Sequence, residues 1–350
     1  METDSDLAGR LASFCTRALT GSGECSVRDV RRLSDGWESE MYSFTVQSED
    51  RAARDLVLRI YPGSPVSRPG RKCEREYNVM RKLHESGYPV PRVFCMEKDS
   101  ALFGSPFLLM EKIDGVPFHI FFEHAPADAR HALHELFVGL LARLHNLDWQ
   151  PFWEVLSAPG DRKPDPSDTR ELIAAELAMW RDALVQLGEA GYEGLMGWLD
   201  TRLAVVAPVG PSLMHMDYHV RNVLMTADAR PYVIDWPSAA VGDYRFDLAW
   251  SLVHTDPAGE QDSLSLYKRL SGRDLKDLDI FRVLAWARRT LSIVISVRHG
   301  AETLGMRPGA ENTMKKSAGH LERMYRALVQ ATGLRLPGVE SLLAELGRPI

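Results

Sequence analysis

The sequence predicts an α+β fold in which a β-rich N-terminal lobe precedes a larger, mainly helical lobe. Runs rich in Val, Leu, Tyr and Phe, with turn residues between them, fill much of residues 1–112. Apolar residues recur at helical spacing through most of the remaining chain. A turn at 113–117 separates the two patterns. The predicted organisation is therefore an N-terminal lobe with a leading helix over 1–112, a hinge over 113–117, and a helical lobe over 118–350.

Two helices and five strands are expected in the N-terminal lobe. Apolar residues at helical spacing from Leu7 to Leu19 predict a leading amphipathic helix over 6–20. A second helix is expected to cross the sheet, and Gly87-Tyr-Pro-Val-Pro91 ends it. This crossing helix spans 71–86, and the strands span 27–33, 41–46, 55–61, 93–97 and 107–112.

Helices dominate the expected C-terminal lobe, and two short strands around 222–235 are the exception. The predicted helices span 128–147, 168–187, 194–204, 261–270, 278–298, 312–331 and 339–346.

Composition limits the classes of function. A length of 350 residues suits about two domains or lobes. The net charge of −6 argues against a nucleic-acid partner, which needs a concentrated basic surface. Four cysteines without a Cys-x-x-Cys pair are typical of reduced thiols. The acidic start lacks the order of a secretion signal, and no apolar run approaches about 18 residues. We expect a cytoplasmic protein with no membrane segment.

Three polar residues gather around one predicted hairpin. Asp217 lies in Leu213-Met-His-Met-Asp-Tyr-His-Val-Arg-Asn-Val-Leu224, Asn222 follows five positions later, and Asp235 lies in Tyr232-Val-Ile-Asp-Trp236. Two carboxylates 4 Å apart repel by roughly 4 kcal/mol at an effective dielectric constant near 20. Such a group is a poor structural device unless a cation lies between its members. With Mg²⁺ and a nucleoside triphosphate it becomes a phosphoryl-transfer site.

The spacing of these residues resembles that of a known superfamily. His-x-Asp-x-His-x-x-Asn ends at Asn222, Ile-Asp-Trp follows at 234–236, and Gly242-Asp-Tyr-Arg-Phe-Asp-Leu-Ala249 comes next. Together they resemble the aminoglycoside phosphotransferase and choline kinase superfamily, over roughly residues 25–330. The resemblance implies a bilobal protein-kinase-like fold, with a five-stranded antiparallel sheet, a crossing helix and a helical lobe that carries the catalytic loop and the acceptor site.

The resemblance also assigns roles in catalysis. Asp217 is the expected base that orients the acceptor hydroxyl and takes its proton. Asn222 and Asp235 are the expected Mg²⁺ ligands, and all three count as catalytic. Asp243 and Asp247 are expected to brace the catalytic loop, with Asp247 bonding its backbone.

Six further residues are expected to bind the co-substrate, ATP or GTP. Arg59 stands on the third strand, where protein kinases place a lysine, and Glu76 of the crossing helix is its expected partner, with Glu74 as a competitor. The turn over 34–39 is expected to cover the triphosphate. Gly36, the only glycine of this turn, and Ser39 are the candidates there. The main chain of Glu111 and Ile113 is expected to meet the purine edge.

The sequence does not identify the acceptor. A hydroxyl on a small molecule is expected, such as an aminoglycoside, an amino alcohol, a sugar or a macrolide. The alternative is a catalytically silent nucleotide-binding regulator, to which the sparse glycine turn and Arg59 point. A protein kinase is disfavoured because Asp-Phe-Gly and Ala-Pro-Glu are missing, and because only six residues separate Asp235 from Gly242.

Overall fold

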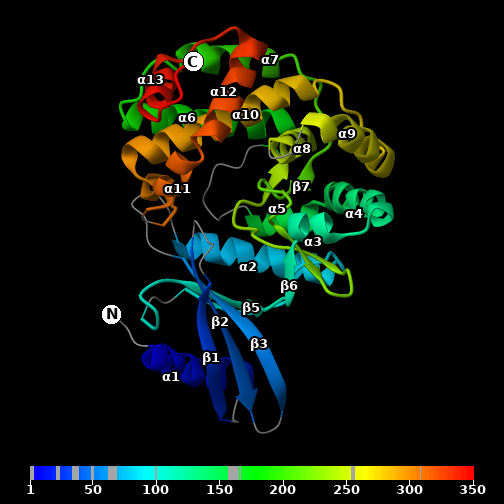
Figure 1. The fold of residues 1–350 in the computed structure, drawn as a ribbon, viewed down its shortest axis with the longest axis vertical. Helices are drawn as coiled ribbons and strands as arrows, with labels where there is room; N and C mark the ends of the chain where they lie inside the picture. Colours follow the sequence, from blue (N-terminus) through cyan, green and yellow to red (C-terminus); the bar gives the residue numbers. More distant parts are fainter. Residues whose placement is uncertain are drawn as a thin grey trace. The chain divides into compact units, whose positions relative to one another are not determined.

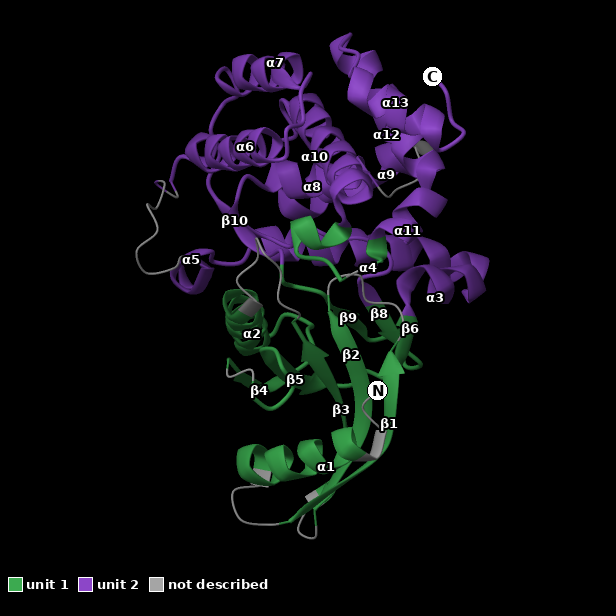
Figure 2. Ribbon diagram, turned by 90° about the vertical axis from the view of Figure 1, so that its left-hand side faces the viewer, with its two compact units in different colours: residues 1–116, 224–237, 301–310 green, residues 117–223, 238–300, 311–350 purple. Residues whose placement is uncertain are grey.

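The structure, a computed structural model, describes residues 4–20, 24–33, 39–48, 51–61, 69–98, 101–156, 165, 167–253, 257–307 and 309–350. Two compact units are present (Figure 2). Unit 1 comprises residues 1–116, 224–237 and 301–310, and unit 2 comprises 117–223, 238–300 and 311–350. Among the described residues, no helix is both long enough and apolar enough to cross a membrane.

A five-stranded antiparallel sheet forms the centre of unit 1 and confirms the predicted α+β class (Figure 1). Its strand order is β1-β2-β3-β5-β4. The strands are β1 (Cys25–Leu33), β2 (Glu40–Ser48), β3 (Arg51–Ile60), β4 (Val93–Glu97) and β5 (Phe107–Glu111). The helices are α1 (Asp4–Cys15), followed by a π-helical turn η1 (Thr16–Thr20), and the crossing helix α2 (Pro69–Glu85).

The two helices contact opposite faces of this sheet. Leu56 and Leu58 of β3 join a core with Leu7 and Leu11 of α1. Side chains alternate along a strand, so Arg59 points to the other face, where it contacts α2. This alternation positions the guanidinium of Arg59 under the crossing helix.

A smaller sheet in unit 1 has the strand order β6-β8-β9. It consists of β6 (Gly115–Pro117), β8 (Val223–Thr226) and β9 (Pro231–Val233), and unit 1 also contains a 3₁₀ turn, η2 (Ala301–Leu304). The segment after β9 carries Asp235. Val233 N–H donates to the carbonyl of Pro89 at 2.8 Å, which ties this segment to the chain after α2.

Gly115 makes a close approach to β8, and this approach gives a testable prediction. A Cβ at Gly115 would lie 2.8 Å from the carbonyl oxygen of Met225, which is backbone and cannot rotate away. We expect Gly115→Ala to lower the free energy of unfolding by about 1–3 kcal/mol, through overpacking. Urea unfolding measures this change. Gly197→Ala is the control, because nothing lies within 4 Å of that position, so it should not destabilise. Equal losses in both variants would contradict the steric explanation.

Unit 2 is mainly helical (Figure 1). Its helices are α3 (Phe118–His124), α4 (Ala127–His145), α5 (Gln150–Leu156), α6 (Thr169–Gln186), α7 (Glu193–Leu203), α8 (Tyr244–Leu252), α9 (Pro257–Ser271), α10 (Leu278–His299), α11 (Ala310–Lys316), α12 (Ala318–Thr332) and α13 (Pro337–Glu345). Strands β7 (Ser212–Met214) and β10 (Ala240–Gly242) pair antiparallel. Strand β7 leads into the segment that carries Asp217, and β10 leads into α8.

The expectations for unit 2 need correction, because one predicted helix is divided and because α3, α5, α8, β7 and β10 were not predicted. The single helix predicted over 312–331 is two helices, α11 and α12, which are separated at Ser317. Helix α8 was not predicted because its residues 244–251 are buried on every side. A helix that is buried all round lacks the one-sided periodicity by which helices are found in a sequence.

Candidate active site

The candidate residues fall on both units: Arg59, Glu76 and Asp235 on unit 1, and Asp217 and Asn222 on unit 2. In unit 1, Arg59 links the other two. Its Nη1 donates to Glu76 Oε1 at 2.8 Å, and its Nη2 donates to Asp235 Oδ1 at 2.8 Å. The expected Arg59–Glu76 pair is therefore present. Glu74, the competing candidate, pairs instead with Lys98 at the surface.

Glu76 is fully buried, and several donors satisfy it. Besides Arg59, the hydroxyl of Tyr61 donates to Oε2, and the backbone N–H of Trp236 donates to Oε1 at 3.2 Å. Burial raises the pKa of Glu76, and the charge of Arg59 opposes that shift. For Arg59, burial lowers the pKa, but the carboxylates of Glu76 and Asp235 outweigh burial and raise it well above its usual value. The guanidinium is therefore charged at every physiological pH.

Asp235 has a backbone conformation that is uncommon for its residue type. Its φ of 70° lies in the left-handed region, which Asp and Asn adopt more readily than most residues. Its side chain is 35% exposed, whereas that of Arg59 is 5% exposed. One carboxylate oxygen therefore contacts the buried guanidinium, while the side chain as a whole stays accessible to a ligand.

The other nucleotide candidates of unit 1 are placed as follows. Ser39 is buried, and its Oγ makes no hydrogen bond within the described part of the chain. Gly36 lies outside the described residues. The N–H of Glu111 donates to the carbonyl of Arg92 at 2.8 Å. Ile113 lies between β5 and β6, in a segment without regular structure.

The catalytic loop of unit 2 brings Asp217 and Asn222 together. Nδ2 of Asn222 donates to the carbonyl of Asp217 at 2.9 Å and to its Oδ2 at 3.1 Å. Trp250 Nε1 donates to the other carboxylate oxygen, Oδ1, at 3.2 Å. The amide nitrogen of Asn222 thus faces the loop, which leaves its Oδ1 as the atom suited to a hard cation. The preceding residue, Met216, has a φ of 65°, a strained value of the kind that clusters at functional sites.

Asp247 accepts hydrogen bonds from the backbone of this loop, as expected. Its Oδ2 accepts from the backbone N–H of His215 at 2.7 Å, and its Oδ1 accepts from that of Met216 at 2.7 Å. His145 Nε2 lies 3.1 Å from Oδ2, and Nδ1 of the same ring lies 2.6 Å from the hydroxyl of Tyr267. Burial alone would raise the pKa of Asp247, but the hydrogen bonds from His145 and from the loop backbone outweigh burial and lower it. Asp247 therefore stays ionised.

His145 gives the protein a predictable dependence on pH. Burial lowers its pKa below the ordinary value of 6.5, although Asp247 opposes the shift. Below pH 6.5 the unfolded chain binds a proton at this residue that the folded chain does not bind. We therefore expect the free energy of unfolding to fall as pH decreases from about 6.5.

Urea unfolding between pH 5 and 8 tests this dependence. His145→Gln should flatten the slope below about pH 6.5, while lowering stability at pH 8. His124→Gln serves as the control, because that ring is exposed and lies outside the network. Parallel pH profiles for wild type and His145→Gln would contradict the assignment.

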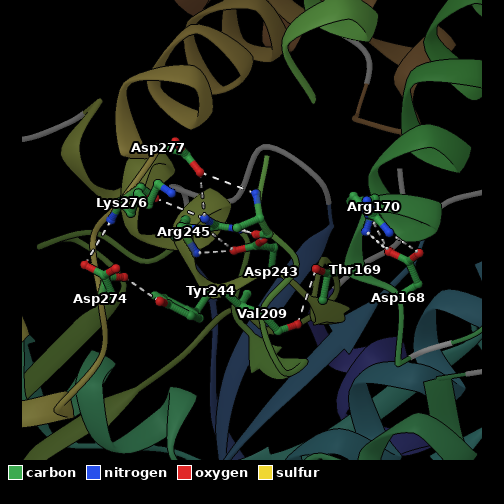
Figure 3. Close-up of polar contacts among 11 residues, drawn as sticks. Asp168, Thr169, Arg170, Val209, Asp243, Tyr244, Arg245, Asp274, Lys276 and Asp277 are labelled. Carbon is green, nitrogen blue, oxygen red and sulfur yellow. Dashed lines mark hydrogen bonds and ion pairs between the residues drawn. The ribbon is translucent and has the colours of Figure 1, made fainter. Parts of the chain in front are cut away.

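A second buried carboxylate, Asp243, has a different role from Asp247. It caps α8, and it pairs with Arg245 through contacts of 3.0 Å and 2.7 Å (Figure 3). Arg245 also donates to the carbonyls of Lys276 at 3.0 Å and Ala207 at 2.8 Å. Every nitrogen of this guanidinium has a short partner, so Arg245 is a structural brace. Arg245 was not identified from the sequence, where the only sign of its role is its position between Asp243 and Asp247.

Mg²⁺ prefers hard oxygen ligands. Within the described part of the chain, no three His, Cys, Asp or Glu residues form a metal-binding cluster. Mg²⁺ is commonly bound through one or two carboxylates together with substrate phosphates and waters. Asp235 offers a carboxylate and Asn222 an amide oxygen, and both are ligand types that Mg²⁺ accepts.

Comparison with known proteins decides the family. A model of the phosphotransferase enzyme family matches residues 29–286, well over half of the chain. The chain belongs to the phosphotransferase enzyme family. The superfamily resemblance inferred from the motif is thereby confirmed.

Two curated relatives of this phosphotransferase-family chain are much longer proteins. Acyl-CoA dehydrogenase family member 10 of Mus musculus is 28% identical over 241 residues, which cover 67% of this chain and 21% of that protein. Acyl-CoA dehydrogenase family member 11 of Gallus gallus is 27% identical over 249 residues, which cover 69% of this chain and 30% of that protein. The chain thus spans less than a third of each relative.

Solved structures share the fold at low identity. A Ralstonia eutropha protein, assigned provisionally as an aminoglycoside phosphotransferase, aligns with a TM-score of 0.64 at 18% identity over 93% of this chain and 98% of that one. Choline kinase LicA from Streptococcus pneumoniae gives 0.59 at 15% identity, over 93% and 99%. An aminoglycoside phosphotransferase, APH(4)-Ia, in a ternary complex with ADP and hygromycin B gives 0.57 at 16% identity, over 91% and 98%. These likenesses confirm the bilobal protein-kinase-like fold.

Proposed function

We propose that this protein transfers the γ-phosphoryl group of ATP or GTP to a hydroxyl of a small molecule, with Mg²⁺ as cofactor. The arrangement of Asp217 and Asn222 carries the proposal. Both side chains meet in one loop, whose backbone is fixed by the ionised Asp247. Family membership supports the reaction class, and the complex of APH(4)-Ia with ADP supports a nucleotide co-substrate.

In the proposed reaction, Asp217 orients the acceptor hydroxyl and receives its proton. The acceptor oxygen forms a bond to the γ-phosphorus, while the bond between that phosphorus and the β,γ-bridging oxygen breaks, and the nucleoside diphosphate leaves. This transfer is loose, so positioning matters more than forced ionisation of the hydroxyl. Mg²⁺, held by Asn222 and Asp235, would neutralise charge on the phosphates.

The remaining candidates of unit 1 are assigned to the nucleotide. Arg59, kept charged by Glu76, would grip the phosphates with its planar fork, as a lysine does in protein kinases. The buried Oγ of Ser39 is a suitable donor to a phosphate oxygen. Gly36 belongs to the same covering turn. For the purine edge, the main chain of Ile113 is the stronger candidate, because the N–H of Glu111 already donates to Arg92.

A second acceptor class has a specific observation in its favour. Several curated relatives are named as acyl-CoA dehydrogenases, and this chain matches only a part of each. A hydroxyl on an acyl thioester is therefore a candidate acceptor, beside the amino sugars, amino alcohols and sugars suggested by the superfamily.

Release of nucleoside diphosphate tests the proposal. The full chain is incubated with Mg²⁺–ATP or Mg²⁺–GTP and with panels of aminoglycosides, amino alcohols, sugars, hydroxy acids and hydroxyacyl thioesters. We expect release that requires both Mg²⁺ and one acceptor class, with a phosphorylated product detected by mass spectrometry. Nucleotide binding without transfer to any acceptor would instead support the silent regulator.

A further inference from the structure

An arginine pair on helix α10 lies beside the catalytic loop, and it bears on the nature of the acceptor. Nη1 of Arg288 lies 3.4 Å from the carbonyl oxygen of Met216, the residue before Asp217. The same guanidinium stacks over the ring of Trp250, with Cζ 4.5 Å from the ring centre. Since Trp250 donates to Asp217, these contacts place the charge of Arg288 next to the proposed base.

The polar contacts of Arg288 are long, unlike those of Arg245 in the same unit. Apart from the Met216 carbonyl, its ionic contact is Nε to Glu176 Oε1, at 3.7 Å. Charge-assisted hydrogen bonds of arginine usually measure about 2.7–2.9 Å. Arg245 reaches 2.7–3.0 Å at each nitrogen (Figure 3). Within the described part of the chain, the donors of Arg288 are therefore poorly matched, although its side chain is 24% exposed and a ligand can reach it.

The surroundings add further positive charge. Arg289 follows directly; burial lowers its pKa, while Asp217 attracts its charge and Arg288 repels it. His320 of α12 has a pKa lowered to about 4, by burial first and then by Arg289 and Arg323. That histidine is neutral near pH 7, so the positive charge comes from the arginines. Among the described residues, Glu176 lies near Arg288 and Asp217 attracts Arg289, and the carboxylate oxygens of Asp217 already accept from Trp250 and Asn222.

We infer that the acceptor carries an anionic group, a carboxylate or a phosphate, which Arg288 binds while its hydroxyl meets Asp217. This inference rests on the proposed function, and it narrows the acceptor classes. Amino sugars and choline are cations, and two guanidiniums beside the base would repel them. A planar guanidinium stacked on an indole ring is well suited to bidentate recognition of carboxylate or phosphate oxygens.

Matched acceptors separate charge from shape. One arm compares hydroxy carboxylates with their methyl amides, and a second compares glycerol 3-phosphate with glycerol; choline and kanamycin supply cations. Binding is measured by calorimetry with Mg²⁺ and a non-hydrolysable ATP analogue, and turnover by diphosphate release. We expect the anionic member of one arm to bind about ten- to a hundredfold more tightly than its neutral partner, as one or two charge-assisted hydrogen bonds predict. The arm that responds identifies carboxylate or phosphate.

Variants assign the effect to Arg288. Arg288→Met should remove most of the preference for the anion, mainly through KM, and should leave the affinity for the nucleotide unchanged. Arg288→Lys should restore part of that preference. The control is Arg282→Met, which removes a positive charge from the same helix at a residue paired with Glu260 and Asp279, and it should keep the full preference.

Distinct outcomes overturn the two proposals. Equal binding of the charged and neutral partners, binding of neither, or preferred binding of a cation would overturn the anionic acceptor. Turnover of a neutral or cationic acceptor in those cases would leave the phosphotransferase proposal standing. Anion-selective binding that Arg288→Met abolishes, without turnover of any acceptor, would keep the anion site and overturn the catalytic proposal.

Discussion

Replacing Asp217 with asparagine is expected to lower turnover by about 10²- to 10⁴-fold, the usual contribution of a positioned base. An amide cannot accept the proton of the acceptor hydroxyl. The substitution also disturbs the local hydrogen bonds, because the carboxylate of Asp217 in the wild type accepts from both Trp250 Nε1 and Asn222 Nδ2. An asparagine has only one oxygen, so one of these contacts would become donor against donor. Steady-state kinetics with the identified acceptor measures the loss.

The control for Asp217→Asn is Asp200→Asn. Asp200 is an exposed carboxylate on the same unit that pairs with Arg181 at the surface, and its replacement should leave turnover unchanged. The affinity of Asp217→Asn for Mg²⁺–nucleotide should match that of the wild type, because the proposed ligands are Asn222 and Asp235. A variant that retained a tenth or more of the wild-type turnover would rule out Asp217 as the base.

Replacing Arg59 with methionine is expected to be the most destabilising single change in unit 1. Arg59 and Glu76 are both buried, so the variant would leave a buried carboxylate without its cation. Removing one partner of a buried ion pair costs about 3–5 kcal/mol. Burial already raises the pKa of Glu76, and the charge of Arg59 opposes that rise. It would rise further in the variant, so the loss of stability should shrink toward acid pH as Glu76 takes up a proton.

Urea unfolding at several pH values tests this prediction. The double variant Arg59→Met with Glu76→Gln should recover part of the stability, because it removes the buried charge as well. Arg170→Met is the matched control, since its pair with Asp168 is exposed and solvent-screened pairs contribute little to stability. A loss in Arg59→Met no larger than in the control would contradict the proposed importance of the buried pair. Arg59→Met should also weaken nucleotide binding.

The residues of the motif could be located from the sequence. Several of the contacts that keep these residues in position could not. The alternation of β3 places Arg59 on the α2 face, where the crossing helix supplies Glu76. The five-residue spacing of Asp217 and Asn222 corresponds to a single loop in which one side chain bonds the other. In both cases the spacing in the chain is short or is fixed by a regular sheet, so local pattern is sufficient.

Contacts between residues far apart in the chain leave no such signal. His145 of α4 contacts Asp247 of α8 and Tyr267 of α9, and nothing in their local sequence indicates these contacts. Arg288 and Arg289 lie on a long amphipathic helix, where charged residues are usually solvated. Their place beside the catalytic loop follows only from the packing of α8 against α10, and α8 itself is buried on every side, so it shows no one-sided pattern.

The proposed function requires that Asp235 and Asn222 bind a divalent ion that carries the nucleotide. The variant Asp235→Asn tests this requirement most directly. Asparagine tolerates the left-handed φ of 70° at this position and can still accept from Arg59, so the fold should survive. The measurement is the affinity for ATP by calorimetry, with Mg²⁺ and with EDTA, for wild type and variant. We predict that the wild type binds ATP at least about tenfold more tightly with Mg²⁺, and that Asp235→Asn loses this dependence. An equal dependence on Mg²⁺ in both proteins would contradict the account.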